Sequence, residues 1–322
     1  MSLLLKTKPF SFELLRSLKT SKGILKKKEG WLIHLQTNSG KSGWGEVAPI
    51  SKVELKNCKR IIKSLDTNIS RELLEKKLSH FPASLGFGLG AALAEIDSLI
   101  DFQSSYNWSN IAQTAFLLPT DQSLISELES KLHHSSNHLK ELTFKWKVGI
   151  LSNEAEKKLL EEILNRLPAN SHLRIDANEG WSRKTANEWA HYLINEKRLE
   201  WLEQPLPSND IEGLTELSTR IPIALDESLL DNPELRKSWK SWQIRRPLLE
   251  GDPRILLQEL NNKIGFRVIS TSFETGIGKR WVEYLATLQQ KGPTPTVPGL
   301  GIGWCPNHQL FSKDPKLVWE AA

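Results

Sequence analysis

Two patterns of apolar and polar positions divide the chain, and the first covers its N-terminal part. Residues 30–37 and 42–50 alternate between apolar and polar side chains, and the Asn-Ser-Gly sequence between them favours a turn. We therefore expect an antiparallel hairpin. Residues 72–78 and 88–100 carry small and apolar residues at helical spacing. Together these segments predict an α+β domain at the start of the chain.

From residue 114 on, short apolar runs alternate with amphipathic helical segments. This alternation is typical of βα units that build a parallel sheet. Seven such runs are visible, over residues 114–119, 143–150, 172–178, 199–206, 221–228, 242–248 and 266–273. Helices are expected over residues 154–167, 182–194 and 233–240, and an eighth strand near residues 294–300.

The segment 233–240 has a clear helix-start signal. Asp231 or Asn232 can serve as its N-cap, and Pro233 suits the first helical turn.

The spacing of these units predicts the domain organisation. A complete (β/α)₈ barrel takes about 250 residues, or roughly 30 per unit. The last units of this chain are tighter, so we expect a barrel trimmed of its last helix, over residues 106–303. The α+β domain is expected over residues 1–105, joined by the C-terminal segment 304–322.

Composition narrows the class of partner. The net charge is +5, spread widely, and residues 26–28 are the only tight run of lysines, which we interpret as a solvated strand end or loop. This mild excess does not indicate nucleic-acid binding, but it suits a small anionic substrate. Cys58 and Cys305 match neither a disulfide framework nor a zinc site, so a reducing cytoplasm is expected. We expect no signal peptide and no membrane span.

Three acidic residues stand at the C-terminal ends of three successive predicted strands: Asp176, Glu203 and Asp226. Active sites of βα barrels lie at these strand ends. Three converging carboxylates repel one another unless a cation neutralises them, and oxygen ligands suit Mg²⁺, with Mn²⁺ as the second choice. The alternative is that each acid caps the following helix. Because three acids stand at the ends of three successive strands, metal binding is favoured over helix capping.

Asn178 and Glu227 lie close to these acids in the sequence and are expected to support the site from beside the ligands. For Glu227, an exposed position at the start of a helix is the alternative.

The strand before Asp176 carries Lys145 and Lys147, which face the same way because they are two residues apart. The alternative is that both lysines lie on the solvent-exposed face of an edge strand. The intervening Trp146 is apolar, as expected of the face that packs against barrel helices, so we expect both lysines to point to the barrel mouth. A lysine beside a second cation and a metal loses its proton more readily and can act as a base.

Arg246 precedes Pro247 and lies on the opposite strand face from Arg245, so only one of the two arginines can point inward. We expect Arg246 to do so. The alternative is that Arg246 faces outward or pairs with a helix acid, with its strand shifted by one residue.

A further strand end offers hydroxyls and backbone N–H groups. Ser270, Ser272 and Gly276 are candidates to hold a second carboxylate of the substrate. The alternative is that this segment only forms a tight βα turn.

These motifs together resemble the enolase superfamily, and within it the muconate-lactonizing-enzyme-like subgroup. Their order and spacing match the family as well as their residues. The matching motifs are GWGEVAP at 43–49, KxK at 145–147, DAN at 176–178, EQP at 203–205, DES at 226–228 and SFETGIG at 272–278. The resemblance therefore covers most of the chain.

The resemblance implies an α/β fold, a modified TIM barrel of the (β/α)₇β type with an N-terminal α+β capping domain. It also implies that Asp176, Glu203 and Asp226 bind the metal and that Lys147 is the acid/base. The departure is at Arg246, where the family normally has lysine.

For the activity, the resemblance implies a lyase. The expected reaction is a metal-dependent syn dehydration of 2-succinyl-6-hydroxy-2,4-cyclohexadiene-1-carboxylate through an enediolate, a step of menaquinone or phylloquinone synthesis. The first alternative is an N-succinylamino acid racemase or dipeptide epimerase of the same superfamily. The second is a noncatalytic barrel that binds a ligand or partner.

Overall fold

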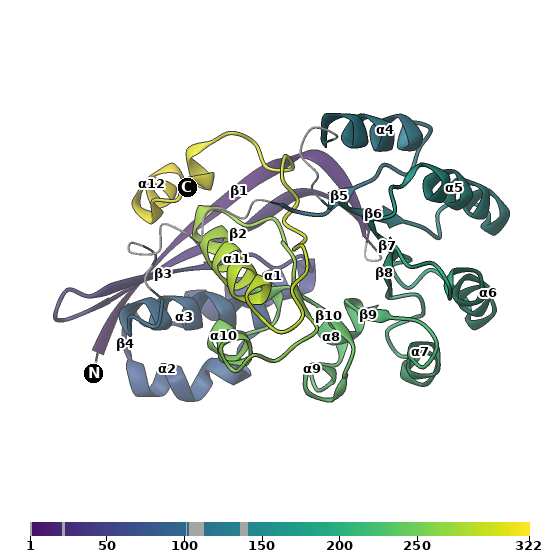
Figure 1. The fold of residues 1–322 in the computed structure, drawn as a ribbon. Helices are drawn as coiled ribbons and strands as arrows, with labels where there is room; N and C mark the ends of the chain where they lie inside the picture. Colours follow the sequence, from purple (N-terminus) through teal and green to yellow (C-terminus); the bar gives the residue numbers. More distant parts are fainter. Residues whose placement is uncertain (1, 21–22, 101, 103–112, 136–140) are drawn as a thin grey trace. The chain divides into compact units, whose positions relative to one another are not determined.

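The computed structural model describes residues 2–20, 23–100, 102, 113–135 and 141–322. Contacts between residues divide the chain into two compact units (Figure 1). One unit joins residues 1–112 to residues 245–322, and the other spans residues 113–244. The boundary predicted between residues 105 and 106 lies outside the described residues.

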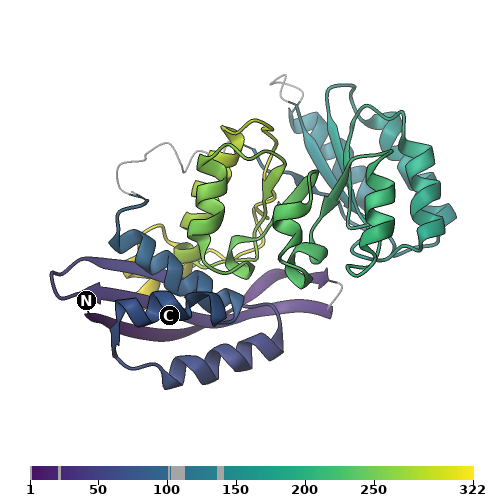
Figure 2. The same ribbon diagram turned by 90° about the horizontal axis from the view of Figure 1, so that it is seen from below.

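The first unit contains an antiparallel sheet in the order β3-β2-β1-β4. Figure 2 shows its two long strands, β1 and β2, side by side. The predicted hairpin is confirmed, because β2 and β3 pair antiparallel with Trp31 opposite Val47. The strands are β1 (Ser2–Thr20), β2 (Gly23–Thr37), β3 (Ser42–Val47) and β4 (Asn68–Ser70).

Helix α3 (Ala83–Ile96) packs against β3 at very close range. A Cβ added to Gly45 would lie 1.8 Å from the carbonyl oxygen of Gly88, and one added to Gly43 would lie 1.9 Å from that of Ala92. The two glycines of the GWGE sequence therefore permit this approach. Two further helices follow β3 in this part of the chain, α1 (Lys52–Ser64) and α2 (Arg71–Lys77).

The prediction for residues 72–78 is confirmed by α2, but the helix predicted over residues 88–100 begins and ends earlier than expected. Helix α3 stops at Ile96, and Ser98 adopts a left-handed φ of 56° that cannot continue it.

The interpretation of residues 26–28 as a solvated run is wrong for Lys28. Its side chain is buried, and its Nζ donates to the carbonyl oxygen of Ala48 at 2.7 Å. Burial lowers the pKa of Lys28 to about 8, although Glu274 and Glu46 oppose this shift. Strand alternation turns Lys28 inward while Lys27 is exposed.

Glu46 on β3 holds the start of helix α11 (Gly276–Gln290) within the same unit. Its buried carboxylate accepts hydrogen bonds from the backbone N–H and the hydroxyl of Thr275, at 3.0 and 2.5 Å, and from Gly278 N at 2.9 Å. These bonds satisfy N–H groups that have no partner inside the helix. The glutamate of the GWGEVAP motif is therefore a cap supplied by the sheet.

Glu46 should make the stability of the protein depend on pH. Burial raises the pKa of Glu46 from 4.5 to about 7, even though Thr275 and Gly278 donate to it. Between these values the folded chain holds a proton that the unfolded chain has lost, so the free energy of unfolding falls as the pH rises. Glu46→Gln has no such proton to lose. Across pH 5 to 8, wild type should lose on the order of 3 kcal/mol relative to this variant.

Urea denaturation at pH 5, 6, 7 and 8 measures this difference. Parallel stability curves for wild type and Glu46→Gln would contradict the prediction.

The second unit is built on parallel strands in the order β10-β9-β8-β7-β6-β5. All of its predicted strands are present. They are β5 (Phe116–Leu117), β6 (Thr143–Lys147), β7 (His172–Asp176), β8 (Leu199–Glu203), β9 (Ile223–Leu225) and β10 (Trp242–Arg245). Helices connect them: α4 (Leu124–Ser135), α5 (Asn153–Arg166), α6 (Arg183–Leu193), α7 (Ile211–Ser218), α8 (Glu227–Asp231) and α9 (Leu235–Ser238).

Helices α4 to α7 form a row along the strands in Figure 1. Phe144 and Trp146 of β6 are buried in the apolar core between strands and helices, together with Leu160 and Trp189. As predicted, the intervening lysines of β6 therefore belong to the other strand face.

The helix predicted over residues 233–240 is reduced to the four residues of α9. Its N-cap is Glu234, so the assignment of Asp231 or Asn232 is wrong. Both residues instead end the short helix α8, in which Asn232 is the C-cap.

The remaining elements belong to the first unit. They are the 3₁₀ turn η2 (Pro247–Leu249), α10 (Pro253–Asn261), β11 (Arg267–Ile269), α11, the 3₁₀ turn η3 (Gln309–Phe311) and α12 (Pro315–Ala321). The eighth strand is reduced to a single parallel bridge between Ser270 and Gly299. The strand and helix alternation otherwise agrees with a modified (β/α)₇β barrel preceded by an α+β domain.

Both cysteines are free thiols. In the part of the chain that the structure describes, every helix is too short or too polar to cross a membrane.

Candidate active site

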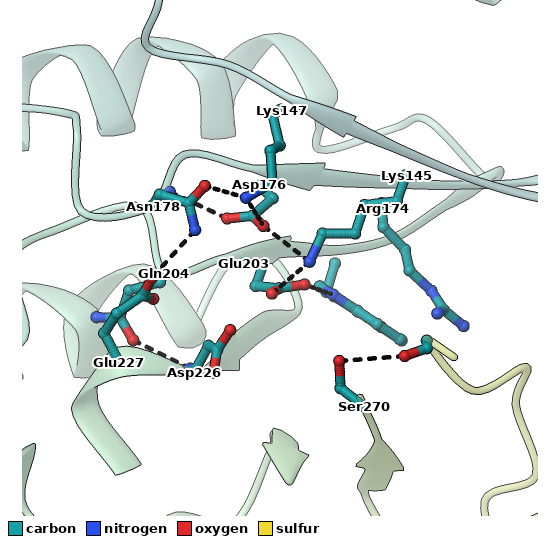
Figure 3. Close-up of polar contacts among 12 residues, drawn as sticks. Lys145, Lys147, Arg174, Asp176, Asn178, Glu203, Gln204, Asp226, Glu227 and Ser270 are labelled. Atoms are coloured by element: carbon teal, nitrogen blue, oxygen red, sulfur yellow. Dashed lines mark hydrogen bonds and ion pairs between the residues drawn. The ribbon is translucent and has the colours of Figure 1, made fainter. Parts of the chain in front are cut away.

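The predicted acids and one of the predicted lysines lie in a row across the strand ends of the second unit. Lys147 on β6 is paired with Asp176 on β7, and Asp176 is paired with Glu203 on β8. Asp226 follows the end of β9, the next strand. The three acids have exposed fractions of only 1%, 1% and 2%. Parallel strands in register therefore bring these buried carboxyl groups to one edge of the sheet (Figure 3).

The alternative that these acids cap the following helices is wrong for Asp176 and Glu203. Helix α6 is capped by the side chain of Ser182, and α7 by that of Asp210. Asp226 is the N-cap residue of α8, as the alternative expected, but its side chain makes no capping hydrogen bond to the helix.

Lys145 brings two of the acids together. Its Nζ lies 2.7 Å from Asp176 Oδ2 and 2.6 Å from Glu203 Oε1. Burial alone would lower the pKa of Lys145, but Asp176, Glu203 and Asp226 together raise it above its usual value. Burial opposes ionisation of Asp176, yet Lys145 and Lys147 hold its pKa below the usual range. Burial and the neighbouring Asp176 raise the pKa of Glu203. The carboxylates of Asp176 and Glu203 are thus crowded around the single ammonium group of Lys145.

Lys147 lies beside the same acids, 3.3 Å from Asp176 Oδ2. Its ammonium also donates to Asn178 Oδ1. Asn178 has a left-handed φ of 43°, and its side-chain amide donates to Glu227 Oε1 at 3.0 Å. Asn178 therefore adjoins Lys147 and Asp176, and Glu227 contacts the site through Asn178 (Figure 3).

Gln204 is a residue of this site whose role the sequence did not indicate. It is fully buried, and its Oε1 accepts from the backbone N–H groups of Asp226 and Ser228, both at 3.1 Å. Its amide nitrogen donates to Ser228 Oγ at 2.7 Å. Gln204 therefore fixes the end of β9 to the end of β8 and sets the backbone of Asp226. The only signal was its position beside Glu203 in the EQP motif.

The donor chemistry of the site fits a hard divalent cation. Asp176, Glu203 and Asp226 offer buried carboxylate oxygens, and a positive group, the Lys145 ammonium, already lies between the first two. Among the described residues, no three His, Cys, Asp or Glu side chains are gathered closely enough to enclose a metal. Asp176 and Glu203, which both contact Lys145, and the adjacent Asp226 offer the carboxylate oxygens that such a cation prefers.

The two neighbouring arginines differ in their partners within the first unit. Arg245 is buried and forms ion pairs with Glu250 at 2.6 Å and with Glu259 of α10 at 2.7 Å. Arg246 instead donates from its guanidinium to the carbonyl oxygen of Thr271, just past β11, at 2.8 Å. Arg245 thus takes the outward position next to a helix, and the inward position of Arg246 stays a prediction.

Among the predicted substrate-binding residues of the first unit, Ser270 and Ser272 follow the end of β11 and Gly276 begins α11. Ser270 Oγ donates to the carbonyl oxygen of Gly299 at 3.3 Å. Ser272 Oγ is buried without a hydrogen-bond partner in the described structure. Gly276 begins α11 so close to Ser312 that a Cβ on it would lie 1.8 Å from the Ser312 carbonyl oxygen. Their contact with a substrate remains a prediction.

Comparison with known families agrees with this architecture. Residues 140–241 match the family described as "Enolase C-terminal domain-like", and residues 14–96 match the "MenC, N-terminal domain". The first match contains Lys147, Asp176, Glu203 and Asp226. The chain therefore has an enolase C-terminal-like domain over residues 140–241 and is an enzyme.

Its relatives narrow this class further. The chain is 29% identical over 250 residues to an o-succinylbenzoate synthase of Thermosynechococcus vestitus, a match that covers 73% of each chain. It is also 29% identical over 286 residues to an o-succinylbenzoate synthase of Photorhabdus laumondii, with 86% of this chain and 83% of the relative covered. Along most of its length, the chain is therefore similar to o-succinylbenzoate synthases.

Solved structures share the fold. An o-succinylbenzoate synthase from Thermosynechococcus elongatus, with magnesium in its active site, matches with a TM-score of 0.80 at 24% identity over 98% of this chain and 99% of that one. A dipeptide epimerase from Enterococcus faecalis, complexed with magnesium and a dipeptide, matches with a TM-score of 0.68 at 19% identity over 93% and 90%. The expected modified barrel with its N-terminal domain is confirmed.

Proposed function

We propose that this chain is an o-succinylbenzoate synthase, a lyase that removes water from 2-succinyl-6-hydroxy-2,4-cyclohexadiene-1-carboxylate. The observation that carries the proposal is the row of Lys147, Asp176 and Glu203, with Asp226 beside it, at one end of parallel strands. The similarity to curated o-succinylbenzoate synthases over most of the chain supports the choice of reaction. The product would serve menaquinone or phylloquinone synthesis.

Asp176, Glu203 and Asp226 would hold a divalent cation, Mg²⁺ or Mn²⁺. When bound, it would supply positive charge to the substrate carboxylate and so favour the enediolate. A structural relative contains magnesium in its active site. Lys145, whose ammonium contacts both Asp176 and Glu203, would add a second positive charge on the same side.

Lys147 would carry both proton transfers. Its amine removes the proton from the ring carbon that bears the carboxylate, and the ammonium then returns a proton to the hydroxyl that leaves from the neighbouring ring carbon. The C–O bond breaks, water departs, and the ring becomes aromatic. One residue suffices if both groups leave from the same face. The contacts of Lys147 with Asp176 and Asn178 hold its amine at the strand end where this transfer is needed.

A direct assay tests this function. Purified protein with Mg²⁺ and the cyclohexadiene substrate should release o-succinylbenzoate, followed as the aromatic product appears. Absence of product from folded, metal-loaded protein would overturn the proposal and leave epimerisation or a noncatalytic barrel as the alternatives.

Epimerisation is the second candidate, because dipeptide epimerases share the fold. A racemase that acts through two bases needs a second acid/base on the opposite face. At the sequence position where the family normally has a lysine, this chain has Arg246. A guanidinium stays protonated and is a poor base, although it can stabilise an anionic intermediate.

We therefore expect dehydration without rapid racemisation. The measurement is incubation of each enantiomer of an N-succinylamino acid in D₂O, beside the dehydration assay, with deuterium uptake and optical activity followed. Fast racemisation with deuterium incorporated from both enantiomers would contradict a one-base site.

A further inference from the structure

A second row of side chains lies on the same strand face as Lys147, Asp176 and Glu203, two residues earlier along each strand. Because alternate residues of a strand share a face, the residues two positions before Lys147, Asp176 and Glu203 point the same way. This second row consists of Lys145, Arg174 and Trp201, which are paired across β6, β7 and β8. Arg174 and Trp201 are both buried, with exposed fractions of 2% and 0%.

The side chain of Trp201 in this second row contacts the carboxylate of Glu203. Its indole Nε1 donates to Glu203 Oε2 at 3.4 Å, while Lys145 Nζ donates to Oε1 at 2.6 Å. Each oxygen of this buried carboxylate therefore has its own donor (Figure 3). A carboxylate held at both oxygens cannot turn freely about its last bond, so its direction is set before any cation binds.

The indole is itself held on both sides. The Arg174 guanidinium lies over the Trp201 ring, 4.2 Å from its centroid, and forms an ion pair with Glu200. The ring of Trp242 lies 4.9 Å from that of Trp201. A cation over an indole face and a neighbouring ring favour one orientation of the side chain. The N–H group of Trp201 therefore points to Glu203 from a fixed place.

We propose that Trp201 is a positioning residue that orients Glu203 and thereby strengthens divalent cation binding. This inference rests on the proposed function only in taking Glu203 as a metal ligand. Trp201 itself contacts neither the cation nor the substrate in this role. Loss of its N–H group should leave one buried oxygen of Glu203 without a donor and free the carboxylate to rotate, which weakens the cation site.

Trp201→Phe tests the proposal, because phenylalanine keeps an aromatic ring and has no N–H group. Mn²⁺ binding to the metal-free full-length protein is followed by the electron paramagnetic resonance of free Mn²⁺, without substrate. We expect the Kd for Mn²⁺ to rise about three- to tenfold. In the product assay, the Mg²⁺ concentration for half-maximal rate should rise by a similar factor, while kcat at saturating Mg²⁺ changes less.

Trp189→Phe is the matched control. Trp189 is also buried in the second unit, and its indole donates to Asn153 at 2.7 Å instead of to an acid of the site. Its loss should leave the Mn²⁺ Kd unchanged. A wild-type Kd for Trp201→Phe, or an equal rise in both variants, would overturn the proposal.

If Trp201→Phe does not fold, benzothienylalanine encoded at position 201 gives the same test, since it matches indole in size and lacks the N–H group. An unchanged Mn²⁺ Kd would again overturn the role. Wild type that forms product but binds no Mn²⁺ would refute the Glu203 site and leave the dehydration standing. Wild type that binds Mn²⁺ without forming product would refute the proposed reaction, and the comparison of Kd values would still decide on Trp201.

Discussion

Lys147→Ala should lower kcat for dehydration by roughly 10²- to 10⁴-fold, the usual effect of losing a general base. Lys147 is the amine that we assign to both proton transfers, and alanine can neither remove a proton nor return one. The variant should still fold and bind Mn²⁺, because the row of acids is held by Lys145 and Gln204 as well. Initial rates of product formation, with a parallel Mn²⁺ titration, measure both properties.

Lys145→Ala and Lys157→Ala are informative comparisons. Lys157 forms an ion pair with Glu188 on the helices of the second unit, so its removal should leave kcat close to that of wild type. Lys145→Ala should weaken turnover through the charge of the site, without removing the base. If Lys145→Ala abolished turnover while Lys147→Ala kept it, the two lysines would have opposite roles.

The barrel strands were predictable from the sequence because each is a short apolar run, and most of these runs have a polar residue at their end. β8 is an example: Trp201 and Leu202 are buried and Glu203 closes the strand. The first strand, β1, was not predictable in this way. Leu3 and Leu5 belong to one apolar core, whereas Phe10 and Phe12 belong to another.

These two pairs of β1 lie on opposite faces, because one pair has odd positions and the other even positions. The strand is therefore covered on one face at its start and on the other face further along. No single alternation runs through it, and Pro9 breaks the apolar pattern between the two parts. Helix α1 was missed for a simpler reason, since only Cys58 and Ile62 are buried on it.

The sequence predicted those residues of the site that carry a charge at the end of a strand. Lys145 was found by the spacing of two residues that links it to Lys147. The same spacing leads from Asp176 to Arg174 and from Glu203 to Trp201, but an arginine or tryptophan inside a strand resembles ordinary core or surface in the sequence. Their contacts depend on strand register, which only the folded sheet defines.

Removal of divalent cations should abolish turnover, and this loss should be reversible. Three buried carboxylates lie at neighbouring strand ends, and the charge that develops on the substrate carboxylate would add to theirs. A metal ion contributes several kcal/mol of stabilisation in such reactions, so we expect a fall of roughly a hundredfold or more after chelation. Mg²⁺ or Mn²⁺ added back should restore the rate of aromatic product formation.

The Glu203→Gln variant tests whether the cation binds at this site or elsewhere in the protein. The amide keeps the size of the side chain but loses its negative charge, so the Kd for Mn²⁺ should rise and the rate at limiting Mg²⁺ should fall. Glu188→Gln, on a half-exposed acid of α6 that pairs with Lys157, is the control and should change neither quantity. Full activity after exhaustive chelation, or a wild-type Mn²⁺ Kd in Glu203→Gln, would contradict the assignment of the three acids as ligands.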